Sequence, residues 1–349
     1  MRRVDWIVMR RLGARVGLTL LVFFGLMALV ESLDSFRFQA LSRIGGMPLA
    51  VSAIVSAAAK TSIGILPVTL LIGTIIGVLD LQSRREMMII RASGMSIWRV
   101  MRAPLIAAFL LGTVSSFVVT PFLIQFSRTL PVSGSRGGGE FWLEQQGEDG
   151  RYILLAQRAR TNGLDTVSLF FVDADQRDRV IASSAKLVRG AWVLSADATR
   201  YRPDKPAEAL PNFRVATNIT EGDMRVRLTS VRELTFFELL SAVGQRIVDP
   251  GMRAATITSL LQLAAAPGLL VGSVLIGFAF TSGYRRTNKY GGAVLYGVVL
   301  GFVVYVVTEL ASRSGLAGVL DPTFAAAGPA FVAIVIGLTV LLYKEDGRA

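Results

Sequence analysis

The chain has 349 residues, 52% of them hydrophobic, and carries a formal net charge of +12. It contains neither cysteine nor histidine, which excludes a disulfide framework, a histidine-liganded metal site and a Ser-His-Asp triad. A charge this basic is compatible with nucleic-acid binding, so the distribution of the cations decides between that function and a place in a membrane.

Six apolar runs are each long enough to cross a bilayer, which takes about 20 apolar residues in a helix. We expect membrane helices at 16–33, 61–81, 104–124, 254–281, 291–311 and 323–343. The first run is too long for a cleavable signal, so we expect it to remain in the protein. The predicted fold is an α-helical membrane protein with three helices in 1–125, three in 253–349, and a polar domain, 126–252, inserted between them.

The cations gather on one side of this arrangement. Fifteen Lys and Arg residues lie in the N-terminal segment, the links 82–103 and 282–290, and the C-terminal tail. The short links on the other side hold Arg37, Arg43 and Arg313, with Lys60 at the start of the second run. Because short cytoplasmic links carry the Lys/Arg excess, we expect both termini in the cytoplasm and the inserted domain outside it. This topology accounts for the basic charge, and nucleic-acid binding is not expected.

In the inserted domain the long apolar runs give way to short segments in which apolar and polar residues alternate, and turn-forming residues separate these segments. Strands are predicted at 151–156, 166–172, 180–188, 191–201 and 224–231. This spacing favours a small all-β sandwich or open roll. Such a domain can hold an amphiphile between its sheets or serve as a docking or spacer domain, and the pattern alone leaves both readings open.

The link between the second and third spans predicts a short amphipathic helix over 84–93, with Gly94 at the C′ position that ends it. Ser96 is expected to cap the following helix. The helix either rests among the lipid headgroups or inserts into a groove on a cytoplasmic partner. Its apolar block, 87–90, is flanked by Arg84, Arg85 and Arg91.

The run 85–94, Arg-Glu-Met-Met-Ile-Ile-Arg-Ala-Ser-Gly, resembles the "SE-hydrophobic-x-A-S/A-G" stretch of the lipopolysaccharide export permeases LptF and LptG. The similarity extends along the whole chain, with the order of three spans, β domain and three spans. The surroundings of two tryptophans are closer to LptG than to LptF. Other matching positions are Val4–Asp5, Leu66–Pro67, Trp142 ahead of Gly150 and Tyr152, Ala191–Trp192 and Gly301–Tyr305.

This resemblance implies a permease subunit of an ABC-type complex in the inner membrane of a Gram-negative bacterium. The complex would extract lipopolysaccharide and pass it through a β-jellyroll domain to a periplasmic bridge. Expected partners are an LptB-like ATPase dimer, a second LptF/LptG-type permease and an LptC-like single-span protein. ATP would bind the partner, because this chain has no Walker motif, so the chain itself would be non-catalytic and without cofactor or metal. The alternative is a membrane-anchored scaffold whose β domain recruits periplasmic partners without transport.

The resemblance also suggests roles for individual residues. Glu86 matches the family acid that faces the ATPase, and Arg84, Arg85, Arg91 and Gly94 would complete the coupling segment. Lys60 matches a cavity lysine that would meet the phosphates of lipid A, unless it snorkels to headgroups. Arg37 and Arg43 could meet the same phosphates. Where relatives often carry a lysine at the end of the first span, this chain has Glu31, which a phosphate would repel.

Two further expectations concern the helices. Glu309 is expected to pair with Arg313, four residues later. Close helix approaches are expected at the Gly-x-x-x-Gly pairs 73/77, 268/272 and 297/301.

Overall fold

The computed structural model describes residues 3–33, 35–129, 141–147, 150–160, 163–172, 178–188, 190–202, 205–217, 231–244, 250–281 and 290–346. The chain divides into two compact units, Met1–Ser127 with Ile257–Ala349, and Arg128–Thr256. The first unit is thus formed by the two ends of the sequence and the second by its middle segment.

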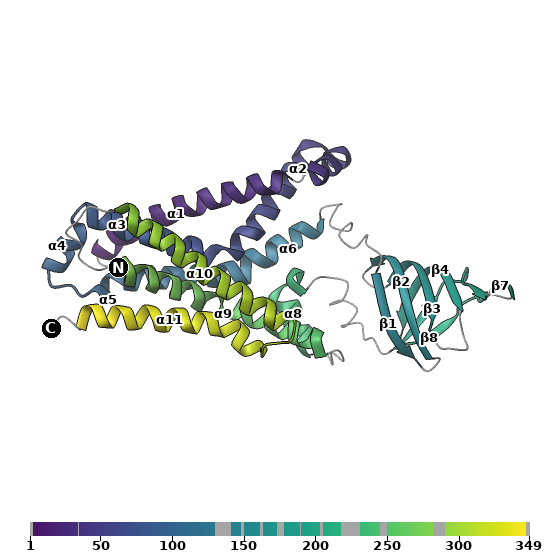
Figure 1. Ribbon diagram of the computed structural model, residues 1–349. Helices are drawn as coiled ribbons and strands as arrows, with labels where there is room; N and C mark the ends of the chain where they lie inside the picture. Colours follow the sequence, from purple (N-terminus) through teal and green to yellow (C-terminus); the bar gives the residue numbers. More distant parts are fainter. Residues whose placement is uncertain are drawn as a thin grey trace. The chain divides into compact units, whose positions relative to one another are not determined.

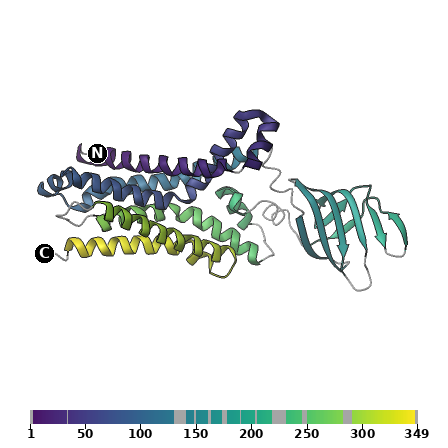
Figure 2. The same ribbon diagram turned by 45° about the horizontal axis from the view of Figure 1, so that its top comes forward.

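The first unit is helical, and its long helices lie side by side (Figures 1 and 2). The described residues contain seven helices long and apolar enough to cross a membrane. One of them, Ile97–Thr129, is built from α5, a π-helical turn at Ser115–Val119 and α6. The helices are α1 (Arg3–Ser32), α2 (Ser35–Gly64), α3 (Leu66–Ser83), α4 (Glu86–Ala92), α5 (Ile97–Val114), α6 (Thr120–Thr129), α9 (Pro250–Thr281), α10 (Tyr290–Leu316) and α11 (Pro322–Asp346).

The structure has one apolar helix more than the six predicted spans. The additional helix comes from the predicted link before the second span. The span 61–81 is divided between α2 and α3 just before Pro67, whose ring suits the first turn of a new helix. The first residue of this span lies beside α1, where the Thr61 hydroxyl donates to Glu31 Oε1 at 3.3 Å. Residues preceding it, expected to be a link, continue as an apolar helix over Gly46–Gly64. The Ala-rich composition of that segment favours the helix.

Glycines bring the helices of this unit together at several of the predicted positions, whereas at Gly268 a Cβ would meet Ala330 at an ordinary contact distance of 3.8 Å. A Cβ on Gly73 would lie 2.9 Å from the Val16 Cα of α1, and one on Gly272 would lie 2.7 Å from the Ala333 Cβ of α11. These distances are too short for any side chain, so the backbones of α1 and α3, and of α9 and α11, approach directly. Gly301 likewise contacts Val68, whereas the side-chain surroundings of position 297 lie outside the described residues.

The second unit contains one eight-stranded antiparallel sheet with the order β1-β2-β3-β4-β5-β8, in which β6 pairs with β4 and β7. The all-β domain is therefore confirmed. Its strands are β1 (Phe141–Gly147), β2 (Gly150–Arg160), β3 (Gly163–Phe171), β4 (Arg179–Val188), β5 (Ala191–Leu194), β6 (Thr199–Arg202), β7 (Lys205–Ala209) and β8 (Arg214–Ala216).

The strands differ from the expectation in several places. The predicted strand 191–201 is two strands, because the chain turns at Ser195–Asp197 before β6 begins. β1, β7 and β8 were not predicted. β1 is polar along much of its length, and β7 falls within a segment bounded by prolines that indicated a turn. The predicted strand 224–231 lies outside the described residues except for Val231, which begins a 3₁₀ turn.

The sheet curls so that its first and last strands meet. Tyr152 donates through its hydroxyl to the Ala216 carbonyl at 2.8 Å, and Thr217 donates to Gln145 Oε1 at 2.5 Å. The core on the inner face is closed around Trp192, Tyr152 and Leu154, which are fully buried. Since Phe141 and Ala216 lie at the same end of the strand register, the chain enters and leaves the sheet at one end.

A short helix follows the sheet in the second unit. α8 (Phe236–Gly244) comes after the 3₁₀ turn Val231–Glu233 and precedes α9. Thr235 and Glu238 form a reciprocal capping box at its start, with Thr235 N–H donating to Glu238 Oε2 at 2.8 Å and Glu238 N–H to Thr235 Oγ1 at 3.3 Å.

Candidate functional site

The candidate site is the turn that carries α4 between α3 and α5. α4 covers Glu86–Ala92, two residues later in its start than the predicted helix. Arg85 separates it from α3 in a left-handed conformation with φ of 59°. Gly94 ends it with φ of 78°, as the C′ position predicted. Ser96 is the N-cap of α5 as expected, but its side chain makes no capping hydrogen bond.

α4 has one buried and one exposed apolar face. Met87 is buried in the main helical core with Leu12 of α1 and Leu81 of α3. On the other side, the side chains of Met88 and Ile89 are 49% and 68% exposed. Met87 thus anchors the helix. The next two residues, Met88 and Ile89, are exposed beside Arg84 and Arg85. An apolar centre with a charged rim is the arrangement of a protein-binding surface.

The anchored side of α4 is held to α1 by charge. Arg11 Nη2 lies 2.7 Å from Glu86 Oε1. The second carboxylate oxygen, Oε2, is buried and makes no hydrogen bond with any residue that the structure describes. Glu86 therefore points toward α1, and its tie to Arg11 is the contact through which a displacement of α4 would reach that helix.

A second pair lies one turn further along α1 and joins that helix to α3. Arg15 donates to Asp80 Oδ1 at 2.9 Å, and Arg84 approaches Asp80 Oδ2 at 3.6 Å. Beside it, Gln82 Nε2 donates to the carbonyl of Thr281 at 2.6 Å, which ties the end of α3 to the end of α9. The end of α3, which precedes α4, is therefore fixed to α1 and α9, two helices from opposite halves of the sequence.

Part of the predicted coupling segment is exposed in the structure. Arg84, Arg85 and Gly94 are exposed at the two ends of α4, while Glu86 faces α1. Arg91 lies within α4, but its side chain is outside the described residues.

The predicted substrate contacts lie on a different helix. Lys60 is half-buried in α2, four residues before the end of that helix at Gly64. Arg37 and Arg43 lie near the start of the same helix, and their side chains fall outside the part that the structure describes. The expected pair of Glu309 and Arg313 is confirmed, with Arg313 Nε donating at 2.8 Å.

Arg11, Arg15 and Asp80 were missed by the sequence analysis. Asp80 is the only acid inside the predicted second span, and an acid at that depth needs a partner. That requirement could have pointed to Arg15, at the edge of the first span. The Arg11–Glu86 pair had no comparable signal, because both residues belong to links crowded with charge.

Comparison with known proteins gives one result. The family model for lipopolysaccharide export system permease LptF/LptG matches residues 6–343, nearly the whole chain. The match does not distinguish LptG from LptF, so the closer likeness to LptG stays a prediction. A search of the curated proteins finds no match.

Proposed function

Because the chain belongs to the LptF/LptG family of lipopolysaccharide export system permeases, we propose that it is the transmembrane subunit through which an ATPase dimer drives extraction of lipopolysaccharide. The chain is a multi-pass inner-membrane protein and a non-catalytic permease of an ABC transporter. ATP binds the partner ATPase, and this chain holds no cofactor of its own.

The observation that carries the proposal is the two-sided α4. Met88 and Ile89 are exposed on a helix that is otherwise fixed in place. Large apolar side chains in this position are suited to a pocket on a partner, where a few buried anchors supply most of the binding energy. The exposed Arg84 and Arg85 form its charged rim. Arg91 and Gly94 complete the docking segment in this proposal.

The anchored face provides the path of motion. Closure of the ATPase dimer displaces α4, and Met87 and the Arg11–Glu86 pair carry this displacement to α1. The Asp80–Arg15 pair joins α3 to α1, and the Gln82–Thr281 hydrogen bond joins α3 to α9, so α3 and α9 move together with α1. Glu86 thus acts as an internal link between the docking helix and the first span.

The lipid is held outside the docking region. Lys60 meets a phosphate of lipid A in the cavity that this permease forms with a second LptF/LptG-type subunit, while Arg37 and Arg43 meet phosphates nearer the surface. The charge distribution supports this sidedness, with both termini in the cytoplasm and the β domain in the periplasm.

The β domain then receives the lipid and passes it to a periplasmic bridge, with an LptC-like single-span protein associated. Its curled sheet, whose first and last strands approach each other around an apolar inner face, supports this route. The scaffold alternative would use the same domain for docking alone and predicts no ATP-dependent release of lipid.

The test is Ile89→Asp in the permease pair co-expressed with its ATPase. We expect the ATPase to be lost on co-purification and ATP-driven lipopolysaccharide release from proteoliposomes to stop. The matched control is Val172→Asp, which places the same charge at an exposed apolar residue of the β domain and should keep the ATPase bound. An Ile89→Asp complex that retains the ATPase and releases lipid at the normal rate would contradict the proposal.

A further inference from the structure

α8, the helix after the sheet, is unusually apolar for a segment outside the membrane spans. Its sequence, Phe-Phe-Glu-Leu-Leu-Ser-Ala-Val-Gly, contains a single ionisable residue, Glu238. A helix of this composition exposed to water on one whole face would leave large apolar side chains solvated. The question is what covers that face.

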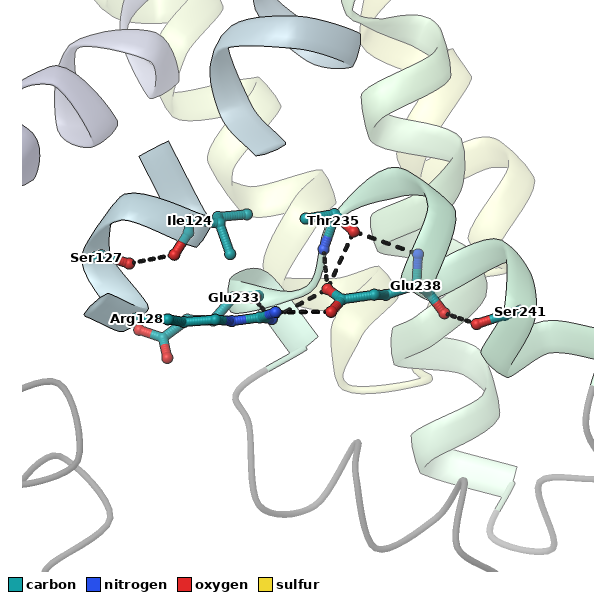
Figure 3. Close-up of polar contacts among 7 residues, drawn as sticks. All are labelled: Ile124, Ser127, Arg128, Glu233, Thr235, Glu238 and Ser241. Atoms are coloured by element: carbon teal, nitrogen blue, oxygen red, sulfur yellow. Dashed lines mark hydrogen bonds and ion pairs between the residues drawn. The ribbon is translucent and has the colours of Figure 1, made fainter. Parts of the chain in front are cut away.

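The one charge on α8 is neutralised by Arg128, as Figure 3 shows. Arg128 Nη1 donates to Glu238 Oε1 at 2.7 Å and Nη2 to Oε2 at 3.0 Å, a bidentate pair. Thr235 donates to the same carboxylate through its N–H and its hydroxyl. Burial raises the pKa of Glu238, but the hydrogen bonds from Arg128 and Thr235 outweigh it and lower the pKa from 4.5 to about 2.

The exposed side of α8 is an apolar stripe. Phe237 is 63% exposed and Leu240 53% exposed, and they lie three residues apart on one face with Val243 at its edge. On the opposite face, Leu239 and Ala242 are buried. The helix therefore has a covered face, an uncovered apolar face and no unpaired charge of its own.

Two tethers set where α8 can lie. Arg128 belongs to the last turn of α6, which is the end of the apolar span Ile97–Thr129. α9, another span, begins at Pro250, six residues after the end of α8, and six residues reach roughly 20 Å at most. Both ends of α8 are thus held close to the ends of membrane helices on the side of the β domain.

We propose that α8 lies in the membrane surface on the side of the β domain, with Phe237, Leu240 and Val243 inserted among the lipids of that leaflet. A short helix with one exposed apolar face, whose single charge is neutralised at its flank, is suited to the boundary between headgroups and acyl chains. The capping box and the Arg128–Glu238 pair complete its polar face, so α8 enters this boundary without an unpaired charge.

The bilayer is a better occupant of this face than a protein. The stripe is only two helical turns long, and its tethers hold it at the level where lipid is already present. Lipid contact also follows continuously from the spans at either end. α8 then attaches the segment that leaves the β domain to the membrane surface.

The chain has no cysteine, so single cysteines can report on the site in the full-length protein. Leu240→Cys and Ser241→Cys are labelled with an environment-sensitive fluorophore and the protein is placed in phospholipid nanodiscs containing spin-labelled lipid. Ser241→Cys keeps all three apolar side chains and guards against a folding defect at position 240. The control is Val172→Cys, an exposed apolar position of the β domain without such tethers.

We expect spin-labelled lipid to quench the labels at 240 and 241 at least about twofold more than the label at 172, and aqueous iodide to quench them less. Labels at 240 and 241 that iodide quenches as strongly as at 172 would overturn the proposal. It would equally be overturned if the labels were shielded from iodide only after a second protein was added, or only on self-association, because the face would then be a protein interface.

Discussion

The family resemblance predicts that Glu86 faces the ATPase, whereas in the structure Glu86 faces α1. One carboxylate oxygen contacts Arg11 and the other is buried. A half-buried carboxylate without its cation is costly, about 1–3 kcal/mol for the unsatisfied group. The pair therefore stabilises the position of α4 before any partner arrives.

The pair can be tested by charge exchange. Arg11→Glu and Glu86→Arg should each lower the melting temperature of the detergent-solubilised protein and reduce ATP-driven lipid release, because each places like charges together. The double exchange should recover a substantial part of both losses. If Glu86→Arg behaves identically whether or not Arg11 is exchanged, Glu86 acts on the ATPase and the α1 link is wrong.

Lys60 is the proposed substrate contact whose charge can be tested directly. Lys60→Gln should reduce photocrosslinking of lipopolysaccharide from neighbouring positions, whereas Lys60→Arg keeps the cation and should retain it. The loss for the glutamine variant should shrink at high salt, because the ion pair is screened. Equal crosslinking in all three proteins would favour a lysine that reaches only headgroups.

Sequence reasoning predicted some features of this region and missed others. Gly94 and the helix before it were predicted because positive φ and helix propensity are local properties. The partner of Glu86 was not, since Arg11 is 75 positions away and only the packing of α1 against α3 brings the two together. Arg15 and Asp80, 65 positions apart, meet through the same packing, although the lone acid in the second span could have indicated that Asp80 needs a cation.

Among the elements, helix-to-helix distance is set by glycine. The Gly73 position tolerates no Cβ, because the Val16 Cα would be 2.9 Å away, whereas a Cβ on Gly17 of α1 meets nothing within 4 Å. Each of the two glycines stands in a Gly-x-x-x-Gly pattern, Gly73 with Gly77 and Gly17 with Gly13, so the pattern alone does not separate them. The difference between them depends on which face of each helix is turned to a neighbour.

This contrast gives a matched pair of substitutions. Gly73→Ala should destabilise the helical unit by about 1–3 kcal/mol through overpacking, measured as a lower melting temperature in detergent. Gly17→Ala should leave the melting temperature unchanged or raise it, because alanine is the better helix former. Equal effects would mean that α1 and α3 can separate freely.

The attachment of α8 should depend on pH through Glu238. Its pKa is lowered from 4.5 to about 2, so the pair with Arg128 contributes fully above pH 4.5 and is lost as the pH falls toward 2. A fluorophore at Ser241→Cys should report release of α8 across this window. With Glu238→Gln added, the signal should start near the released level and stay flat, whereas an unaltered transition would assign the titration to another group.

At the scale of the whole molecule, the two units have separate cores. Trp192 and Tyr152 centre the core of the β domain, while Leu71, Met101 and Phe278 are buried among the helices. The order of helices and β domain could be predicted from hydropathy because each unit must bury its own apolar face. The closure of the sheet could not, since β8 is three residues long and the polar β1 pairs through its backbone.

Separate cores predict separate responses. Trp192→Ala should cost the β domain about 3–5 kcal/mol and accelerate amide exchange in β2–β5, while α3 and α9 remain protected. Trp192→Phe is the control, since it keeps much of the buried volume and removes the indole N–H, which makes no hydrogen bond among the described residues. Faster exchange in both units would show that they unfold together.

The contacts between helices on either side of the β domain also bear on how the protein is made. A Cβ on Gly112 of α5 would lie 2.6 Å from Pro267 of α9, and Gln82 reaches Thr281. The first helices therefore leave the ribosome with faces shaped for partners not yet synthesised. At 5–20 residues per second the wait between α6 and the end of α9 is roughly ten to thirty seconds. During that interval the early helices have been synthesised but lack part of their packing. The nascent first half of the chain is therefore most exposed to cellular quality control at this stage.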